Sequence, residues 1–226
     1  MIVEKSMLAP GTSFATAYYV ISSREPGPVF MIVSGIHGNE PASIRAAKEL
    51  AGKFAREELF LRRGRLIILP LANQKAYRKR RRGVPDLNRT FPRSAGSRAG
   101  HPLAASVFAL AQRYKPNWYL DLHEANGLSQ INRRRVGQTL IISQGSRAGS
   151  LAKRIVKRMN QSILLPSHHF NIHLRERSGT SRMAAERILG ARAVTVETCW
   201  SLSFAVRVRY QQDIVRHFLR SAGLIG

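Results

Sequence analysis

The sequence predicts an α/β fold: a three-layer α/β/α sandwich in which a mostly parallel, mixed β-sheet lies between two layers of helices. Short apolar runs of the kind found in buried strands alternate with longer segments that have the pattern of helices, and this alternation is typical of a sheet covered on both faces. The chain has 226 residues, of which 44% are hydrophobic. This length and composition suit a single globular domain spanning residues 1–226.

The elements in the first part of the chain follow from apolar runs and turn residues. The run 29–33 is continuously apolar, as expected for a strand buried on both faces. Pro41 suits the first turn of the helix that follows. Pro116 and Asn117 form a turn before another buried-type strand, which ends at His123. In order, these elements are strand 17–21, strand 29–34, helix 42–54, strand 65–70, helix 103–114 and strand 118–123.

The second part of the chain continues the same alternation. The segment Ser178-Gly179-Thr180-Ser181 has the composition of a turn followed by a helix N-cap. Residues 193–197 read as another buried strand, and residues 170–174 as a short extended piece. In order, these elements are strand 139–143, helix 149–160, extended piece 170–174, helix 181–189, strand 193–197 and helix 204–222.

The segment Gly35-Ile36-His37-Gly38-Asn39-Glu40 presents a histidine and a glutamate where a buried strand gives way to a helix. Gly35 and Gly38 allow the backbone to turn sharply at this point. His37 and Glu40 can therefore bind the same metal ion. With a second histidine they would form the His₂Glu set of a catalytic zinc site, which leaves one position open for water.

Two later strands end in polar side chains that suit the same site. Strand 118–123 ends in His123, and Asp121 lies on the same face because side chains alternate along a strand. Asp121 could therefore orient a metal-binding histidine. Strand 193–197 carries Glu197 at its carboxyl end. Because open α/β sheets bind ligands at the carboxyl ends of their strands, we expect these groups to share one site.

Four short motifs follow one another along the chain: His37-x-x-Glu40, Asp86-Leu87-Asn88-Arg89-x-Phe91-Pro92, Asp121-Leu122-His123 and Thr195-Val196-Glu197-Thr198. In this order they resemble the motifs of the zinc carboxypeptidase superfamily, and most closely those of its succinylglutamate desuccinylase/aspartoacylase branch. The resemblance covers most of the chain and implies a zinc carboxypeptidase-like fold. It also implies one Zn²⁺ per chain, bound by His37, Glu40 and His123, with Glu197 as the general base.

The resemblance further implies that Asn88 and Arg89 bind a carboxylate of the substrate. Arginine suits this role because its planar guanidinium makes two parallel charged hydrogen bonds to a carboxylate. A cation near the zinc can also stabilise a developing oxyanion, so Arg89 joins Glu197 among the expected catalytic residues. The family pattern places another arginine upstream of Asp86, and both Arg81 and Arg82 have suitable spacing. The sequence leaves the choice between these two open.

The expected reaction is hydrolysis of an amide bond next to a carboxylate in a small acidic substrate. Zinc lowers the pKa of its bound water to ~7 and polarises a carbonyl, and Glu197 would pass the proton of that water to the leaving amine. An N-acyl amino acid deacylase is the preferred reading. A metallocarboxypeptidase that releases the C-terminal residue of a peptide or peptidoglycan fragment is the alternative. Relatives in this branch typically add a C-terminal β-rich domain; we expect none here, which favours the alternative.

Charge and hydropathy define the remaining expectations. The formal net charge of +24 would attract anions and polyanions, so a nucleic-acid-binding protein on an inactive hydrolase scaffold is the second alternative. No nucleic-acid-binding motif accompanies the basic residues, and all the expected catalytic residue types are present.

No run approaches the ~20 apolar residues of a membrane span. The N-terminus lacks the pattern of a signal peptide, so we expect a cytoplasmic protein that does not bind membranes. The single cysteine, Cys199, excludes an internal disulfide.

Overall fold

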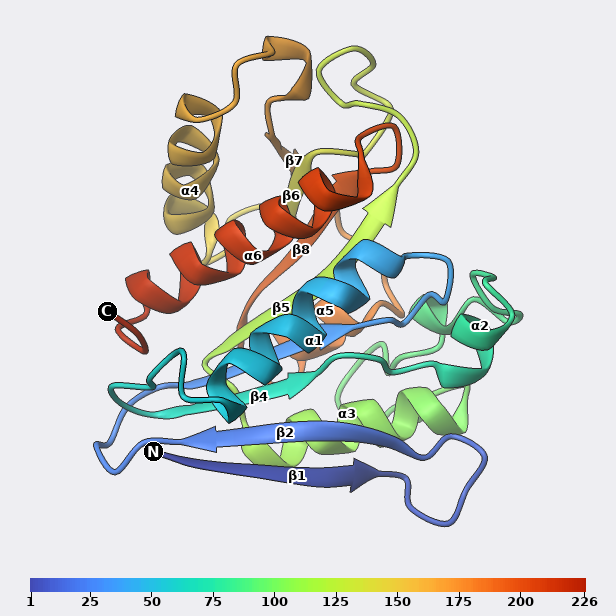
Figure 1. The fold of residues 1–226 in the computed structure, drawn as a ribbon. Helices are drawn as coiled ribbons and strands as arrows, with labels where there is room; N and C mark the ends of the chain where they lie inside the picture. Colours follow the sequence, from blue (N-terminus) through green and yellow to red (C-terminus); the bar gives the residue numbers. More distant parts are fainter.

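The computed structural model describes all residues, 1–226, and is built around one eight-stranded sheet (Figure 1). The strands are β1 (Ile2–Leu8), β2 (Thr16–Ser22), β3 (Val29–Ser34), β4 (Arg65–Leu69), β5 (Trp118–Ala125), β6 (Thr139–Ile142), β7 (Asn171–Leu174) and β8 (Arg192–Cys199). Their order in the sheet is β1-β2-β4-β3-β5-β8-β6-β7. Four of the seven neighbouring pairs are parallel; β1/β2, β2/β4 and β6/β8 are antiparallel. The sheet is therefore mixed and mostly parallel, as predicted.

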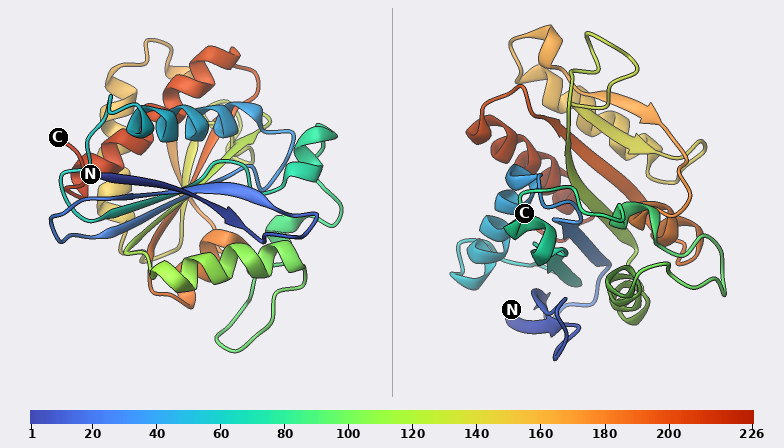
Figure 2. Two further views of the ribbon diagram at one scale, coloured as in Figure 1. Left: turned by 60° about the horizontal axis from the view of Figure 1, so that its bottom comes forward. Right: turned by 90° about the vertical axis from the view of Figure 1, so that its right-hand side faces the viewer.

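Helices cover both faces of the sheet, which confirms the predicted three-layer sandwich (Figure 2). One face carries α1 (Pro41–Ala55), α4 (Gly149–Gln161) and α6 (Phe204–Ser221), and the other carries α3 (Pro102–Tyr114) and α5 (Ser181–Arg187). The short helix α2 (Gln74–Arg78) and the 3₁₀ turns η1 (Leu87–Arg89) and η2 (Pro166–His168) lie in connecting segments. None of these helices combines the length and apolarity that a membrane span requires.

The two faces of the sheet contribute to two separate hydrophobic cores. Along β3, Phe30 and Ile32 pack into a core of 33 buried residues beneath α1, α4 and α6. Met31 and Val33 point the other way, into a core of 22 buried residues beneath α3 and α5. Because alternate side chains of this strand are buried on opposite faces, its sequence is continuously apolar and does not alternate with polar residues.

Every predicted strand and helix has a counterpart whose ends differ by no more than two residues, and the extended piece at 170–174 is β7. Strand β1 and helix α2 were not predicted from the sequence. Strand β1 lies at the edge of the sheet and buries only Leu8, so an apolar pattern is not needed there. Helix α2 is a five-residue helix within a basic segment, and its only strong local signal is the Asn73 side chain, which accepts a hydrogen bond from the Ala76 N–H.

The parallel strands β3, β5 and β8 are neighbours, so their carboxyl ends meet at one edge of the sheet. The register places Ser34 beside Leu122 and His123 directly beside Glu197. The turn that follows β3 carries His37, and α1 begins directly after Glu40. Backbone pairing alone therefore brings three distant segments of the chain to one place.

Gly38 allows α2 to pack tightly against this turn. Its N–H donates a hydrogen bond to the Arg81 carbonyl oxygen at 3.0 Å. A Cβ atom at Gly38 would lie only 2.0 Å from the carbonyl carbon of Ala76, which is backbone and cannot move aside cheaply.

We therefore expect Gly38→Ala to lower the free energy of unfolding by about 2 kcal/mol or more, as steric conflicts of buried backbone do. Thermal unfolding followed by circular dichroism measures the effect. Gly149→Ala is the matched control, because a Cβ there would meet only Ile142 Cδ1 at an ordinary 3.6 Å. Equal melting temperatures for the two variants would contradict the proposed role of Gly38.

Candidate metal centre and substrate pocket

His37 and Glu40 face one another across the turn between β3 and α1. Their side chains are almost fully buried, and His37 Nδ1 lies 2.7 Å from Glu40 Oε1. Glu40 occupies the N-cap position of α1, yet its side chain makes no capping hydrogen bond. The carboxylate is thus available to the histidine. Gly35, at a φ of +66°, makes the sharp turn after β3 that allows this approach.

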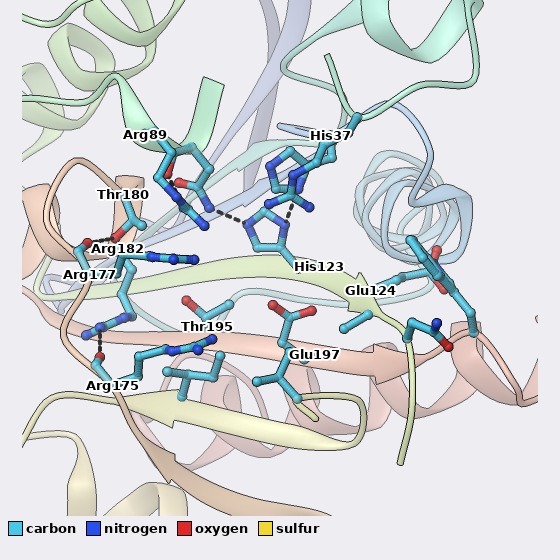
Figure 3. Close-up of a pocket in the computed structure, with 17 residues that line it drawn as sticks. His37, Arg89, His123, Glu124, Arg175, Arg177, Thr180, Arg182, Thr195 and Glu197 are labelled. Atoms are coloured by element: carbon cyan, nitrogen blue, oxygen red, sulfur yellow. Dashed lines mark hydrogen bonds between the residues drawn. The ribbon is translucent and has the colours of Figure 1, made fainter. Parts of the chain in front are cut away.

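His123 completes the group from β5. Its Nδ1 lies 2.8 Å from Glu40 Oε2 and 3.1 Å from His37 Nδ1. One ligand atom from each of the three residues lies within 4.8 Å of the others, and all three residues are buried. Figure 3 shows His37 and His123 directed toward one another above the sheet. This is the donor set, two imidazoles and one carboxylate, that suits a divalent metal ion.

A carboxylate stands behind each histidine. His37 Nε2 lies 2.9 Å from Asp86 Oδ1, and His123 Nε2 lies 3.0 Å from Asp121 Oδ1. Asp121 Oδ2 accepts a hydrogen bond of 2.6 Å from Ser181 Oγ. Carboxylates bound to the outer nitrogen fix the orientation of a metal-binding imidazole and raise its basicity. The Nδ1 atoms of both histidines lie against Glu40. Asp121 lies on the same face of β5 as His123, but its Oδ1 makes no hydrogen bond despite its proximity to Nε2.

The electrostatics of the group favour a positive charge at its centre. Burial opposes ionisation of Glu40, but the charges of His123 and His37 outweigh it and lower the pKa of Glu40 to about 2. Burial also opposes protonation of His123, but Asp121 and Glu40 raise its pKa well above the usual range. The carboxylates that raise this pKa would equally attract a metal cation held between the two histidines. The residues present fit a divalent metal.

Glu197 lies beside this group on β8, at the floor of a pocket. Its Oε2 is buried and has no hydrogen-bond partner. Burial raises the pKa of Glu197 to about 8; Glu40 and Asp121 add to the rise, and His123 and Arg82 oppose it. A carboxyl group with unused lone pairs beside a metal-binding group can accept and return a proton. Its location agrees with the sequence analysis.

Arg82, and not Arg81, reaches this pocket. Arg82 Nη1 lies 3.7 Å from Glu40 Oε1, and its Nη2 lies 3.1 Å from Asp86 Oδ2. Arg81 lines a separate hollow with Phe14 and His101. On the side of the metal-binding turn, only the backbone of Arg81 takes part: its carbonyl oxygen accepts the hydrogen bond from the Gly38 N–H. The sequence could not choose between the two because adjacent residues in an irregular loop point in directions set by the loop conformation.

Asn88 and Arg89 line the pocket from η1. Asn88 Oδ1 accepts a hydrogen bond from the Ser181 N–H at 2.9 Å, and its Nδ2 lies 3.1 Å from His123 Nε2. Arg89 Nε lies 3.9 Å from Asp86 Oδ2, and the side chain is one-third exposed. Desolvation by burial lowers the pKa of Arg89, Asp86 opposes this, and Arg177, Arg82 and Arg175 lower it further. Such crowding of like charges favours an anion as the missing partner.

The pocket has a volume of about 270 Å³, and part of its lining was not predicted from the sequence. Arg182 is buried and paired with Glu186 at 2.8 Å, whereas Arg175 and Arg177 form no ion pair. Trp200 also lines the pocket. Three further arginines carry no signal in a chain of charge +24, so only the fold could single them out.

The raised pKa of Glu197 predicts a pH-dependent cost of folding in the metal-free protein. Between the usual pKa of glutamate, about 4.5, and the folded value of about 8, the folded chain holds a proton that the unfolded chain has lost. This proton uptake destabilises the folded state progressively as pH rises through that window. Glu197→Gln removes the cost. The melting temperature of the variant should therefore exceed that of the parent chain by more at pH 8 than at pH 5, in EDTA. A difference that does not change with pH would contradict the assignment.

Comparisons of the sequence place this site among known proteins. Residues 26–220 match the model of the succinylglutamate desuccinylase/aspartoacylase catalytic domain. A succinylglutamate desuccinylase of Pseudomonas syringae pv. tomato is 37% identical over 119 residues. That segment covers 48% of this chain and 34% of the relative.

Solved structures share the fold at low identity. Cell shape determinant protein Csd4 of Helicobacter pylori superposes with a TM-score of 0.77 at 18% identity, covering 99% of this chain and 56% of that one. The ectoine utilization protein EutE of Ruegeria pomeroyi gives a TM-score of 0.70 at 21% identity, covering 99% of this chain and 68% of that one. A succinylglutamate desuccinylase/aspartoacylase of Rhodobacter sphaeroides gives 0.68 at 18% identity, covering 98% and 65%.

This chain thus spans just over half the length of Csd4, and its match covers about a third of the curated desuccinylase. The family model, in contrast, covers most of the chain, from β3 to the end of α6. It includes the buried His37, Glu40 and His123 group. The chain belongs to the succinylglutamate desuccinylase/aspartoacylase family of metallohydrolases.

Proposed function

We propose that this chain is a zinc-dependent hydrolase of amide bonds next to a carboxylate, and that it acts as an N-acyl amino acid deacylase. The observation that carries the proposal is the unpartnered, buried carboxyl oxygen of Glu197, placed beside the His37, Glu40 and His123 group in a pocket bordered by arginines. A proton acceptor, a metal-binding group and an anion-binding group are the three parts that this reaction needs.

His37, Glu40 and His123 would hold the metal, and Asp86 and Asp121 would keep the two imidazoles oriented. Two imidazoles with one carboxylate favour zinc over the harder cations, which prefer oxygen ligands alone. Bound there, the metal supplies Lewis acidity, which polarises the scissile carbonyl and makes water a stronger acid.

Glu197 would carry the proton. The oxygen of a water molecule forms a bond to the amide carbonyl carbon while Glu197 takes a proton from that water. The carbon–nitrogen bond then breaks, and Glu197 returns the proton to the leaving amine nitrogen. In the metal-free chain burial raises the pKa of Glu197 to about 8, and the charges of His123 and Arg82 oppose this rise. A bound metal cation would act in the same direction as these two charges and favour the ionised form that the first step requires.

Asn88, Arg89 and Arg82 would bind and polarise the substrate. Arg89 borders the pocket together with Arg175 and Arg177, and a substrate carboxylate would relieve the repulsion among these guanidinium groups. Arg82 lies between Glu40 and Asp86, next to the place where the carbonyl oxygen becomes negative. A fixed cation there stabilises the transition state more than the ground state.

Two substrate classes fit this chemistry, and the family favours the first. The chain belongs to the desuccinylase/aspartoacylase family, and its curated relative is a succinylglutamate desuccinylase. A metallocarboxypeptidase acting on peptide C-termini remains the second candidate. The observation in its favour is that the pocket continues past Glu197 to Trp200, which leaves room for a larger acyl half.

The test is a hydrolysis screen that follows amine release from N-acetyl, N-hexanoyl and N-succinyl derivatives of acidic and neutral amino acids, with short peptides alongside. We expect Glu197→Gln to retain its metal and to lose at least about 100-fold in kcat, since a positioned general base contributes ~10²–10⁴-fold. Arg89→Gln should raise KM for carboxylate substrates. Glu57→Gln and Arg98→Gln, both on the exposed surface, serve as controls. Undiminished turnover by Glu197→Gln would remove it from the proton-transfer role, and no turnover of any substrate by the zinc-loaded chain would overturn the proposed function.

A further inference from the structure

We propose that Trp200 forms the wall against which the acyl half of the substrate lies, and that it makes the enzyme selective for apolar acyl groups over dicarboxylic ones. The inference rests on the proposed function, since it assigns the two halves of an N-acyl amino acid to the two ends of the pocket. The observation behind it is that the charges of the pocket are segregated along the direction of β8.

The arginine-rich end of the pocket lies toward the start of β8. Thr195 pairs with Ile141 on β6, and the Arg175 N–H donates a hydrogen bond to the next carbonyl of β6, that of Ile142, at 2.9 Å. Arg182 Nη1 donates to Ser143 Oγ, also at 2.9 Å. In Figure 3, Arg89, Arg175, Arg177 and Arg182 all lie on the Thr195 side of Glu197, and Glu124 lies on the other.

The opposite end of the pocket is reached by continuing along β8 past Glu197. Cys199 pairs with Ala125, two residues or about 7 Å further along the strand. The Trp200 N–H then donates to the Ala125 carbonyl oxygen at 2.9 Å. A Cβ at Gly137 would lie 2.8 Å from Cys199 Cβ, so Val136 enters beside the same point. Apart from Glu124, the lining here is uncharged: Ala125, Asn126, Val136 and Trp200.

No free cation lines this end. Glu124 is held by Arg207 and by the Ala42 N–H, so both charges are already paired. The stem of Arg135 lies against Gly127, outside the pocket lining. A second carboxylate on the acyl group would therefore lose water without gaining a charged partner, which is costly. An apolar group would instead cover the indole of Trp200, which is 38% exposed.

The orientation of the substrate follows from these two ends. In an N-acyl amino acid the carboxylate belongs to the amine half, so this half lies toward Arg89, Arg175 and Arg177. The scissile carbonyl then lies over His123 and Glu197, which are paired across β5 and β8. The acyl chain continues toward Trp200. The substrates assigned by this geometry are N-acyl amino acids whose acyl group is a hydrocarbon chain or an aromatic ring.

The experiment measures kcat/KM for N-hexanoyl-, N-acetyl- and N-succinylglutamate with the zinc-loaded chain and with Trp200→Ala. We expect N-hexanoylglutamate to be the best of the three. Trp200→Ala should lower kcat/KM about tenfold or more for the hexanoyl substrate, because it removes the surface that several methylenes cover, and by less than about twofold for the acetyl substrate. Trp200→Phe should restore most of the loss. Phe204→Ala is the matched control, since Phe204 is 46% exposed but does not line the pocket.

Binding to the Glu197→Gln background separates this inference from the proposed function. Calorimetric affinity for intact N-hexanoylglutamate should fall about tenfold when Trp200→Ala is added and should not change when Phe204→Ala is added. Equal affinity with and without the Trp200 ring would overturn the inference, whether or not the parent chain hydrolyses the substrate. A preference for N-succinylglutamate that is lost in Arg135→Ala would also overturn it, and would leave the deacylase function standing. Absence of all hydrolysis with intact, Trp200-dependent binding would instead count against the function alone.

Discussion

The parallel pairing of β3, β5 and β8 is the constraint on which the rest of the site depends. Because the register sets His123 beside Glu197 and ends β3 one turn before His37, residues separated by up to 160 positions in the sequence meet at one edge of the sheet. Both hydrophobic cores hold these strands. A one-residue slip of β8 would turn Glu197 to the opposite face, so the chemistry is specified by the same contacts that specify the fold.

Around that edge, most buried charged groups are paired with a neighbour of opposite charge. Glu40 faces two histidines, each histidine is backed by a carboxylate, and Arg82 covers Asp86 from the pocket side. Removing one member would leave the others buried without a partner, which costs more than the pair contributes. The uncompensated members are Glu197 and the rim arginines Arg175 and Arg177. These groups face the pocket and have no partner within the protein, so they are free to interact with a substrate.

The sequence predicted the metal-binding group because its signals are local: a glycine-bounded turn carries His37 and Glu40, and buried apolar runs deliver His123 and Glu197. The layered fold was predictable for the same reason, because a strand that is buried on both faces has a continuously apolar sequence. Other features depend on the conformation of irregular loops, which no periodicity encodes. Asp86 behind His37, the choice of Arg82 over Arg81, and the presence of Arg175 in the pocket belong to this class. Trp200 follows β8 in a turn, and only the register shows that it borders the pocket.

The net charge of +24 made nucleic-acid binding an alternative, but the family and the complete site favour the hydrolase.

We propose that His37, Glu40 and His123 together bind one zinc ion. Elemental analysis of the untagged chain, after incubation with zinc and removal of the excess, tests it most directly. His37→Ala provides the comparison, and His168→Ala is the matched histidine control, because His168 lies in the η2 turn and belongs neither to the metal-binding group nor to the pocket lining. We expect one zinc per chain in the parent and in His168→Ala, and none in His37→Ala. Absence of zinc from the parent chain, or equal zinc content in all three proteins, would contradict it.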